Sequence, residues 1–252
     1  VIMMNNAFYL FILFTLFISG CSQKVSDYVE YSTTSSEAAK QMNSGLRYQD
    51  NVAQHLARES FQKAVDLDPE FAIAYYSLAQ MHRDAVKRNA IVKKGKQFVS
   101  KANESEKILI GNMAKDSWWG GEGGVDWSEE IERYNKLFPK EIRYINYLGN
   151  MANYDGDDKS AEAYYKQSLS IKENSDALNS LGYLYSRQGK MEEAKDAFER
   201  QINVSPDLAN PYDSMGDYYL EKKDNKNAKE YFQKALAIDS KFISSKRKIW
   251  RI

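Results

Sequence analysis

The chain has 252 residues, and its 35 basic and 35 acidic side chains give a formal net charge of zero at pH 7. This balance provides no global attraction to nucleic acid or to an anionic membrane, so a nucleic-acid partner is not expected. With 4 prolines and frequent Ala, Lys, Glu and Leu, the composition favours helices over strands. An all-α fold is therefore expected.

The only cysteine, Cys21, follows an apolar run. A single cysteine cannot form an intramolecular disulfide, and the usual cysteine-rich zinc sites are excluded. The run from Ala7 to Ile18 is shorter than the roughly 20 residues of a membrane-spanning helix, but it suits a signal-peptide core. Its end, Ile18-Ser19-Gly20-Cys21, resembles the bacterial lipobox. The resemblance implies cleavage before Cys21 and a lipid anchor of fatty acyl chains, such as palmitate, on this residue.

The segments on either side of Cys21 complete the expected N-terminal organisation. Residues 1–20 form the expected signal peptide, although no Lys or Arg precedes the apolar run. An ordinary signal peptide or an N-terminal helix is the alternative. Residues 21–37 are polar and indicate a lipid-anchored flexible tether. Because Ser22 is not acidic, similarity to Gram-negative lipoproteins implies the outer membrane, facing the periplasm.

Residues 38–241 contain a repeated pattern of small and aromatic residues, which is clearest between Leu181 and Ser240. The first copy is Leu181, Gly182, Tyr185, Ala194, Phe198 and Pro206, followed 34 residues later by Met215, Gly216, Tyr219, Ala228, Phe232 and Ser240. A fixed period of this kind is typical of helical repeats, in which each unit buries its apolar face against its neighbours. The pattern resembles the tetratricopeptide repeat (TPR) family. The resemblance implies a right-handed α-solenoid of five to six helix-turn-helix repeats.

The same residues mark earlier repeats. In the first repeat, from about Ala38 to Phe71, Gly45 is expected to let two antiparallel helices approach and Phe61 to fill the space around their contact. After the irregular middle of the chain, the repeat pattern resumes with Leu148, Gly149, Ala161 and Tyr165. Gly156 and Gly189 are expected to end helices in the left-handed conformation.

Residues 84–141 form an irregular middle. A helix near Lys87 to Ala102 is expected to present one apolar and one basic face, the latter with Lys87, Arg88, Lys93, Lys94, Lys96 and Lys101. A solvated face explains this pattern, with a lipid or glycan-phosphate site as the alternative. A glycine-rich stretch with Trp118, Trp119 and Trp127 either covers an irregular seam between repeats or forms a loop that binds a sugar or peptide.

Residues 242–252 are expected to form a C-terminal helix that caps the solenoid, with Trp250 packed against it. The two histidines, His55 and His82, are 27 residues apart, and no catalytic triad or metal-ligand cluster can be assembled around them. We therefore expect no enzyme activity, no catalytic residue, no metal site and no cofactor apart from the lipid on Cys21.

The TPR resemblance also implies where a partner binds. In this family the first helix of each repeat lines a concave groove, and fixed positions of that helix face the partner. Carried over position by position, the resemblance selects Tyr76, Gln80, Arg83, Arg143, Asn146, Asn150, Asn153, Asn179, Tyr183, Arg187, Asn210, Asp213 and Asp217. The asparagines could hydrogen-bond the main chain of an extended peptide, or they could be tolerated polar residues on a solvated surface.

These features predict a lipid-anchored scaffold or adaptor of the cell envelope that binds a protein or peptide partner through its groove. Asp213 and Asp217 near the far end of the groove favour a basic segment of the partner. The alternative is a peptidoglycan- or glycan-binding accessory protein that uses the tryptophan-rich loop.

Overall fold

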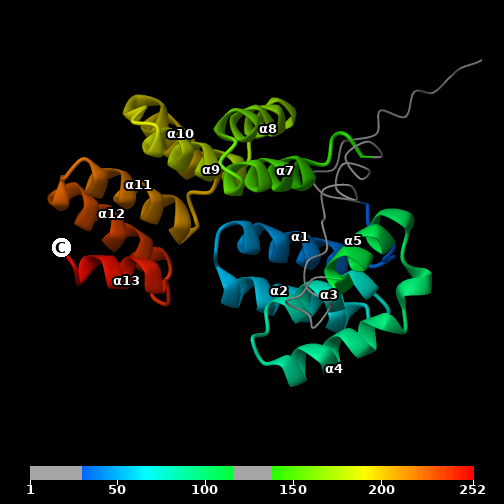
Figure 1. Cartoon of the computed structure of the whole chain (residues 1–252). Helices are drawn as coiled ribbons and strands as arrows, with labels where there is room; N and C mark the ends of the chain where they lie inside the picture. The colour runs from blue at the N-terminus through cyan, green and yellow to red at the C-terminus, as the bar shows by residue number, and fades with distance from the viewer. Residues whose placement is uncertain (1–29, 116–137) are drawn as a thin grey trace, which may run out of the picture.

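The computed structural model describes residues 30–115 and 138–252, and all regular elements within these ranges are helices (Figure 1). The predicted all-α class is confirmed. The N-terminal half contains α1 (Ser36–Asp50), α2 (Gln54–Leu67), α3 (Ala72–Gln80), α4 (Ala85–Lys96), the 3-10 helix η1 (Val99–Lys101) and α5 (Glu104–Lys115). The C-terminal half contains α7 (Ile142–Tyr154), α8 (Asp158–Ile171), α9 (Ser175–Arg187), α10 (Met191–Val204), α11 (Ala209–Glu221), α12 (Asn225–Ile238) and α13 (Ile243–Ile249). None of the described helices has the length and apolarity needed to cross a membrane.

Consecutive helices pack in pairs, and in four of the five pairs a glycine of the first helix receives an aromatic ring of the second. In the α3–α4 pair the glycine is Gly95 of the second helix, which packs against Tyr75 of the first. The pairs are α1 with α2, α3 with α4, α7 with α8, α9 with α10, and α11 with α12. At Gly149, an added Cβ would come within 2.6 Å of a Tyr165 ring carbon, a distance that real side chains do not tolerate. Gly45 and Phe61 repeat this arrangement, as the sequence predicted.

Each turn inside a regular pair contains one residue with a positive φ. Gly156 and Gly189 have φ values of 79° and 73°, which confirms their predicted left-handed conformation. The equivalent turns contain Val52 at 60° and Lys223 at 58°. A β-branched residue such as Val52 is sterically disfavoured there, so the α1–α2 turn carries local backbone strain.

Two buried clusters provide most of the core. In the N-terminal half, the cluster surrounds α3, in which residues 72–79 are all buried between α2, α4 and α5. In the C-terminal half, it includes the fully buried Tyr165 and Phe198 together with Leu184 and Met215. The core is therefore distributed over separate clusters along the stacked pairs rather than concentrated at one centre.

Three details differ from the sequence-based expectations. The helix expected up to Ala102 ends at Lys96, because Phe98 leaves the helix and stacks on Tyr75 with ring centroids 6.2 Å apart. Arg88 is 9% exposed and does not belong to the exposed basic face, since it lies on the same side of α4 as the buried Gly95. Trp250 is 91% exposed, so its predicted packing role is wrong: α13 ends at Ile249, and Phe242 provides the buried contact instead.

The α1–α2 turn contacts the C-terminal half at four points, which we call the clasp. Arg47 donates to Asp207 at 3.1 Å, and Arg143 pairs with Asp50 at 3.1 Å. Ser175 donates to Asn51 at 2.6 Å, and His55 Nε2 lies 3.8 Å from Asp239 Oδ1. The four C-terminal residues lie at or near the starts of α7, α9, α11 and α13, and Figure 1 shows these helices curving around the end of the α1–α2 hairpin.

Candidate functional site

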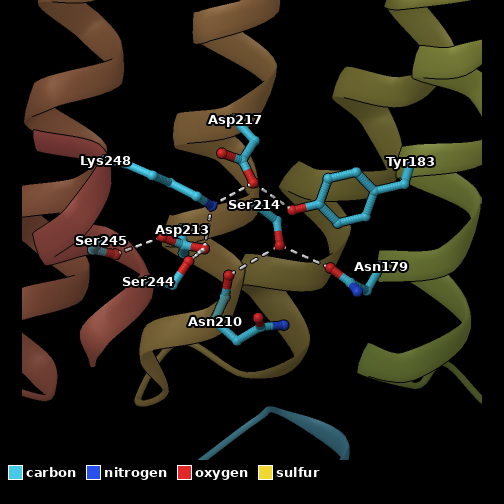
Figure 2. Close-up of polar contacts among 9 residues, drawn as sticks. All are labelled: Asn179, Tyr183, Asn210, Asp213, Ser214, Asp217, Ser244, Ser245 and Lys248. Atoms are coloured by element: carbon cyan, nitrogen blue, oxygen red, sulfur yellow. Dashed lines mark hydrogen bonds and ion pairs between the residues drawn. The ribbon is translucent and has the colours of Figure 1, made fainter. Parts of the chain in front are cut away.

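The predicted groove residues of the C-terminal half are joined from one repeat to the next by hydrogen bonds. Arg187 Nη2 of α9 donates to Asn153 Oδ1 of α7 at 2.8 Å. Ser214 Oγ of α11 donates to Asn179 Oδ1 of α9 at 2.8 Å, as Figure 2 shows. We call this series of contacts between first helices the polar ladder. It holds side chains at the predicted inward positions in defined orientations.

Three asparagines of the polar ladder use their side-chain amides in the same way, with Oδ1 accepting a hydrogen bond. Asn150 Oδ1 accepts from the Tyr165 hydroxyl at 2.7 Å and from Ser180 Oγ at 3.3 Å, just as Asn153 and Asn179 accept through Oδ1. The Oδ1 atom of each asparagine is therefore occupied as an acceptor. The three Nδ2 groups, which can only donate, have no hydrogen-bond partner among the described residues. Asn150 is exposed, and Asn153 and Asn179 are half-buried. The arrangement presents a set of amide donors suited to carbonyl oxygens.

Tyr183 and Arg187 border these donors. Tyr183 is 39% exposed, packs edge-on against Phe198 with centroids 5.2 Å apart, and donates its hydroxyl to Asp217 at 2.8 Å. Burial and the neighbouring Asp217 raise the pKa of Tyr183 above its ordinary range, so it remains a neutral donor. Arg187 is also held by Asp158, while 52% of its side chain is exposed. Both side chains can contact a ligand without rearranging the repeat.

The acidic end of the ladder already has a basic partner within the chain. Lys248 of α13 contacts Asp213 at 2.7 Å and Asp217 at 2.6 Å (Figure 2). Asp213 is 4% exposed and also accepts from Ser244 at 2.9 Å and Ser245 at 2.6 Å. Burial raises the pKa of Asp217, and Lys248 acts in the opposite direction. The basic segment that these aspartates were expected to select is therefore, in this structure, α13.

The remaining predicted groove residues lie elsewhere. Tyr76 is 3% exposed in the N-terminal core, and Asn146, which donates to Asn174 at 3.0 Å, is also 3% exposed. Asn210 is 7% exposed, so these three side chains are not accessible to a partner in this conformation. Gln80 is half-buried at the end of α3, and Arg83 is exposed just beyond it.

The last predicted C-terminal position to be placed, Arg143, is part of an acidic cluster at the clasp. Desolvation raises the pKa of Glu141 to about 7 and that of Asp176 to about 6, and it also raises the pKa of Asp50. Arg143 opposes these shifts but does not cancel them. Sequence analysis missed Asp176, although it stands 33 residues after Arg143, at the equivalent position of the next repeat. It also missed Glu141 and Lys248, for which no repeat position gave a signal.

Other predicted features lie outside the described residues. These are the lipidation residue Cys21 and the tryptophans of the glycine-rich loop, Trp118, Trp119 and Trp127. Within the described residues, no group of three or more His, Cys, Asp or Glu side chains is arranged to hold a metal ion.

Comparison with known proteins agrees with the geometry. Residues 175–241 match the family model for the tetratricopeptide repeat. The chain is 26% identical to human protein O-mannosyl-transferase TMTC3 over 197 residues, which cover 77% of this chain and 22% of that protein. Thus the chain spans less than a quarter of this relative, whose name describes a transferase.

A solved structure shows a similar fold, and a second match is weaker. The Cut9–Hcn1 hetero-tetramer of the APC/C has a chain that matches with a TM-score of 0.50 and 18% identity, over 85% of this chain and 42% of that one. MamA matches with a TM-score of 0.40 and 18% identity, over 81% of this chain and 93% of its own. TPR-type solenoids typically serve as scaffolds that bind other proteins on their curved surface. Residues 175–241 therefore match the tetratricopeptide repeat, and the described residues form an all-α solenoid with the fold of TPR proteins.

Proposed function

We propose that this protein is a lipid-anchored scaffold of the bacterial cell envelope that binds an extended segment of a partner protein on its polar ladder. The observation that carries the proposal is the shared orientation of Asn150, Asn153 and Asn179, whose acceptors are engaged and whose amide donors are available. Backbone carbonyls are present in every extended peptide, so such donors bind main chain with little dependence on its sequence. Tyr183 and Arg187 add contacts that distinguish side chains.

The attachment to a membrane depends on Cys21. Its place at the end of an apolar run supports acylation there. The flexible tether would then be shorter than the sequence predicted, residues 22–29 and about 15 Å, because Tyr31 packs against Phe71 and Ser32 donates to Glu106. Two or three acyl chains would hold the protein stably at the bilayer and raise the local concentration of its partner. The test is metabolic labelling with a fatty acid: Cys21→Ala should lose the label and remain an unprocessed precursor. Undiminished labelling of the variant would refute the anchor.

Binding on the polar ladder is tested with a change that removes the amide donors and keeps the acceptor oxygens, and a control accounts for the added negative charge. In the double variant Asn150→Asp and Asn179→Asp, the side chains keep an oxygen for Tyr165, Ser180 and Ser214 but lose the amide groups. The partner segment is first identified by photocrosslinking from position 183 in cells, and its affinity for the purified chain is then measured.

We expect the double variant to bind that segment on the order of tenfold or more weakly, since two hydrogen bonds are lost. The control is Asn203→Asp, which makes the same substitution once at an exposed position of α10 and should bind normally. Equal affinity of the double variant and the wild-type chain, or an equal loss in the control, would place the binding site elsewhere.

A further inference from the structure

The outward side of α4 carries a concentrated positive charge. Val86, Ala90 and Lys93 follow one another at helical spacing on the exposed side, and Val86 is 80% exposed. Lys87 and Lys94 lie on one flank of this stripe, and Lys96 lies on the other. We call these residues the lysine face. On the opposite side, the buried Gly95 packs against Tyr75 of α3.

The charge of the lysine face is balanced locally only at one end. Asp84 caps the start of α4 and interacts electrostatically with Lys87, and no acidic residue follows from position 85 to 103. Many other lysines of the described chain form ion pairs, such as Lys166 with Glu162 at 2.6 Å and Lys234 with Glu230 at 2.9 Å. Among the described residues, none forms an ion pair with the four lysines of this face. The lysine face is therefore a strongly basic surface on a chain whose net charge is zero.

The geometry of this surface indicates which kind of ligand it fits. From Lys87 to Lys96 the ammonium groups are spread over roughly 14 Å of helix, so they do not converge on one compact anion. Exposed Val86 and Ala90 stand between the lysines, and lysine stems can lie along an apolar layer while their charged ends reach a polar one. In Figure 1, α4 lies at the outer side of the N-terminal half, and α3 is its main packing partner.

We propose that the lysine face binds an anionic phospholipid surface, with the lysines at the phosphate groups and Val86 and Ala90 at the boundary of the acyl chains. The inference does not depend on the polar ladder or on the anchor at Cys21. Each lysine near such a surface contributes about a fivefold gain in affinity at moderate salt, so four contribute on the order of several hundredfold. In an anchored protein, this contact would also fix which side of the solenoid faces the membrane.

The experiment reads contact at α4 itself, so that other membrane contacts of the full chain do not contribute. An environment-sensitive fluorescent amino acid is placed at position 86, or at the exposed position 163 of α8 as a control site. The full chain is mixed with vesicles of phosphatidylcholine, with and without phosphatidylglycerol. We expect a blue shift at position 86 only on vesicles that contain phosphatidylglycerol, reversal by high salt, and no shift at position 163.

Two charge-matched variants decide the role of the lysines. Substitution of all four by glutamine (Lys87→Gln, Lys93→Gln, Lys94→Gln, Lys96→Gln) should abolish the shift or move its midpoint several hundredfold in lipid concentration. Four exposed lysines elsewhere serve as the control: Lys222→Gln, Lys226→Gln, Lys229→Gln, Lys241→Gln. An equal shift on neutral vesicles, or one that survives in the first variant, overturns the proposal. A shift with soluble polyglutamate but not with vesicles also overturns it and assigns the face to acidic proteins.

Discussion

The acidic cluster at the clasp makes the stability of the protein depend on pH in an unusual direction. Glu141 is 9% exposed, and burial raises its pKa from 4.5 to about 7. The folded protein therefore binds a proton at Glu141 over a pH range in which the unfolded chain has released it. By linkage, the free energy of unfolding falls as pH rises from 4.5 to about 7. At about 1.4 kcal/mol for each pH unit, Glu141 contributes about 3 kcal/mol to this loss.

Glu141→Gln removes the ionisation and keeps an oxygen that can accept from the Arg143 backbone N–H at the start of α7. We expect the variant to be more stable than the wild-type chain at pH 8, by up to about 3 kcal/mol, and similar to it at pH 4.5. Part of the pH dependence should remain, because burial also raises the pKa of Asp176 to about 6.

The measurement is urea unfolding followed by circular dichroism at several pH values between 4.5 and 8. The control is Asp157→Asn at the start of α8, where hydrogen bonds from Ser160 lower the pKa of an exposed carboxylate. The ionised form of Asp157 stabilises the folded state above its unfolded pKa, so this variant should gain nothing at pH 8. If Glu141→Gln gains no stability at pH 8, the reasoning from burial is wrong.

Three further changes test the packing and the backbone. Val52→Gly should stabilise the chain by about 1 kcal/mol in urea unfolding, because glycine accepts the positive φ of the α1–α2 turn without strain. Gly182→Ala should destabilise it by about 1 to 3 kcal/mol in the same assay, since the new methyl group meets Phe198, whereas Gly111→Ala, with open space around it, should not. Lys248→Met should lower the stability of the last repeat by about 3 kcal/mol, seen as early loss of amide protection in α13, because Asp213 stays buried without its cation. Unchanged protection in α13 would show that this ion pair is not needed there.

The packing of each repeat was predictable from the sequence because it depends on residues close in the chain. Gly182 and Phe198 meet inside one helix pair, and their spacing recurs in every regular unit. The solenoid follows from such local contacts. The accessible part of the candidate site was less predictable. Asn146 and Asn150 have the same chemistry and lie one helical turn apart, but only Asn150 is exposed, because Asn146 turns towards Asn174.

Contacts between distant parts of the chain could not be predicted from a repeat period. Arg47 and Asp207 are 160 residues apart, and no pattern connects them. Lys248 likewise reaches Asp213 from outside the repeats. A repeat pattern specifies how each unit meets the next one, whereas charge pairing across the molecule depends on the curvature that accumulates over several units.

The clasp changes how this solenoid is expected to respond to a stretching force. An open array of repeats extends and recoils like a spring, and its end repeats unfold independently of the middle. Here, Arg47, Asp50 and Asn51 of the α1–α2 hairpin are joined to three successive repeats of the other half. Stretching the C-terminal half must therefore break contacts to the N-terminal half, so the ladder is held at one curvature. When the two ends of the chain are pulled apart, we expect the contacts of the clasp to break together before individual repeats unfold.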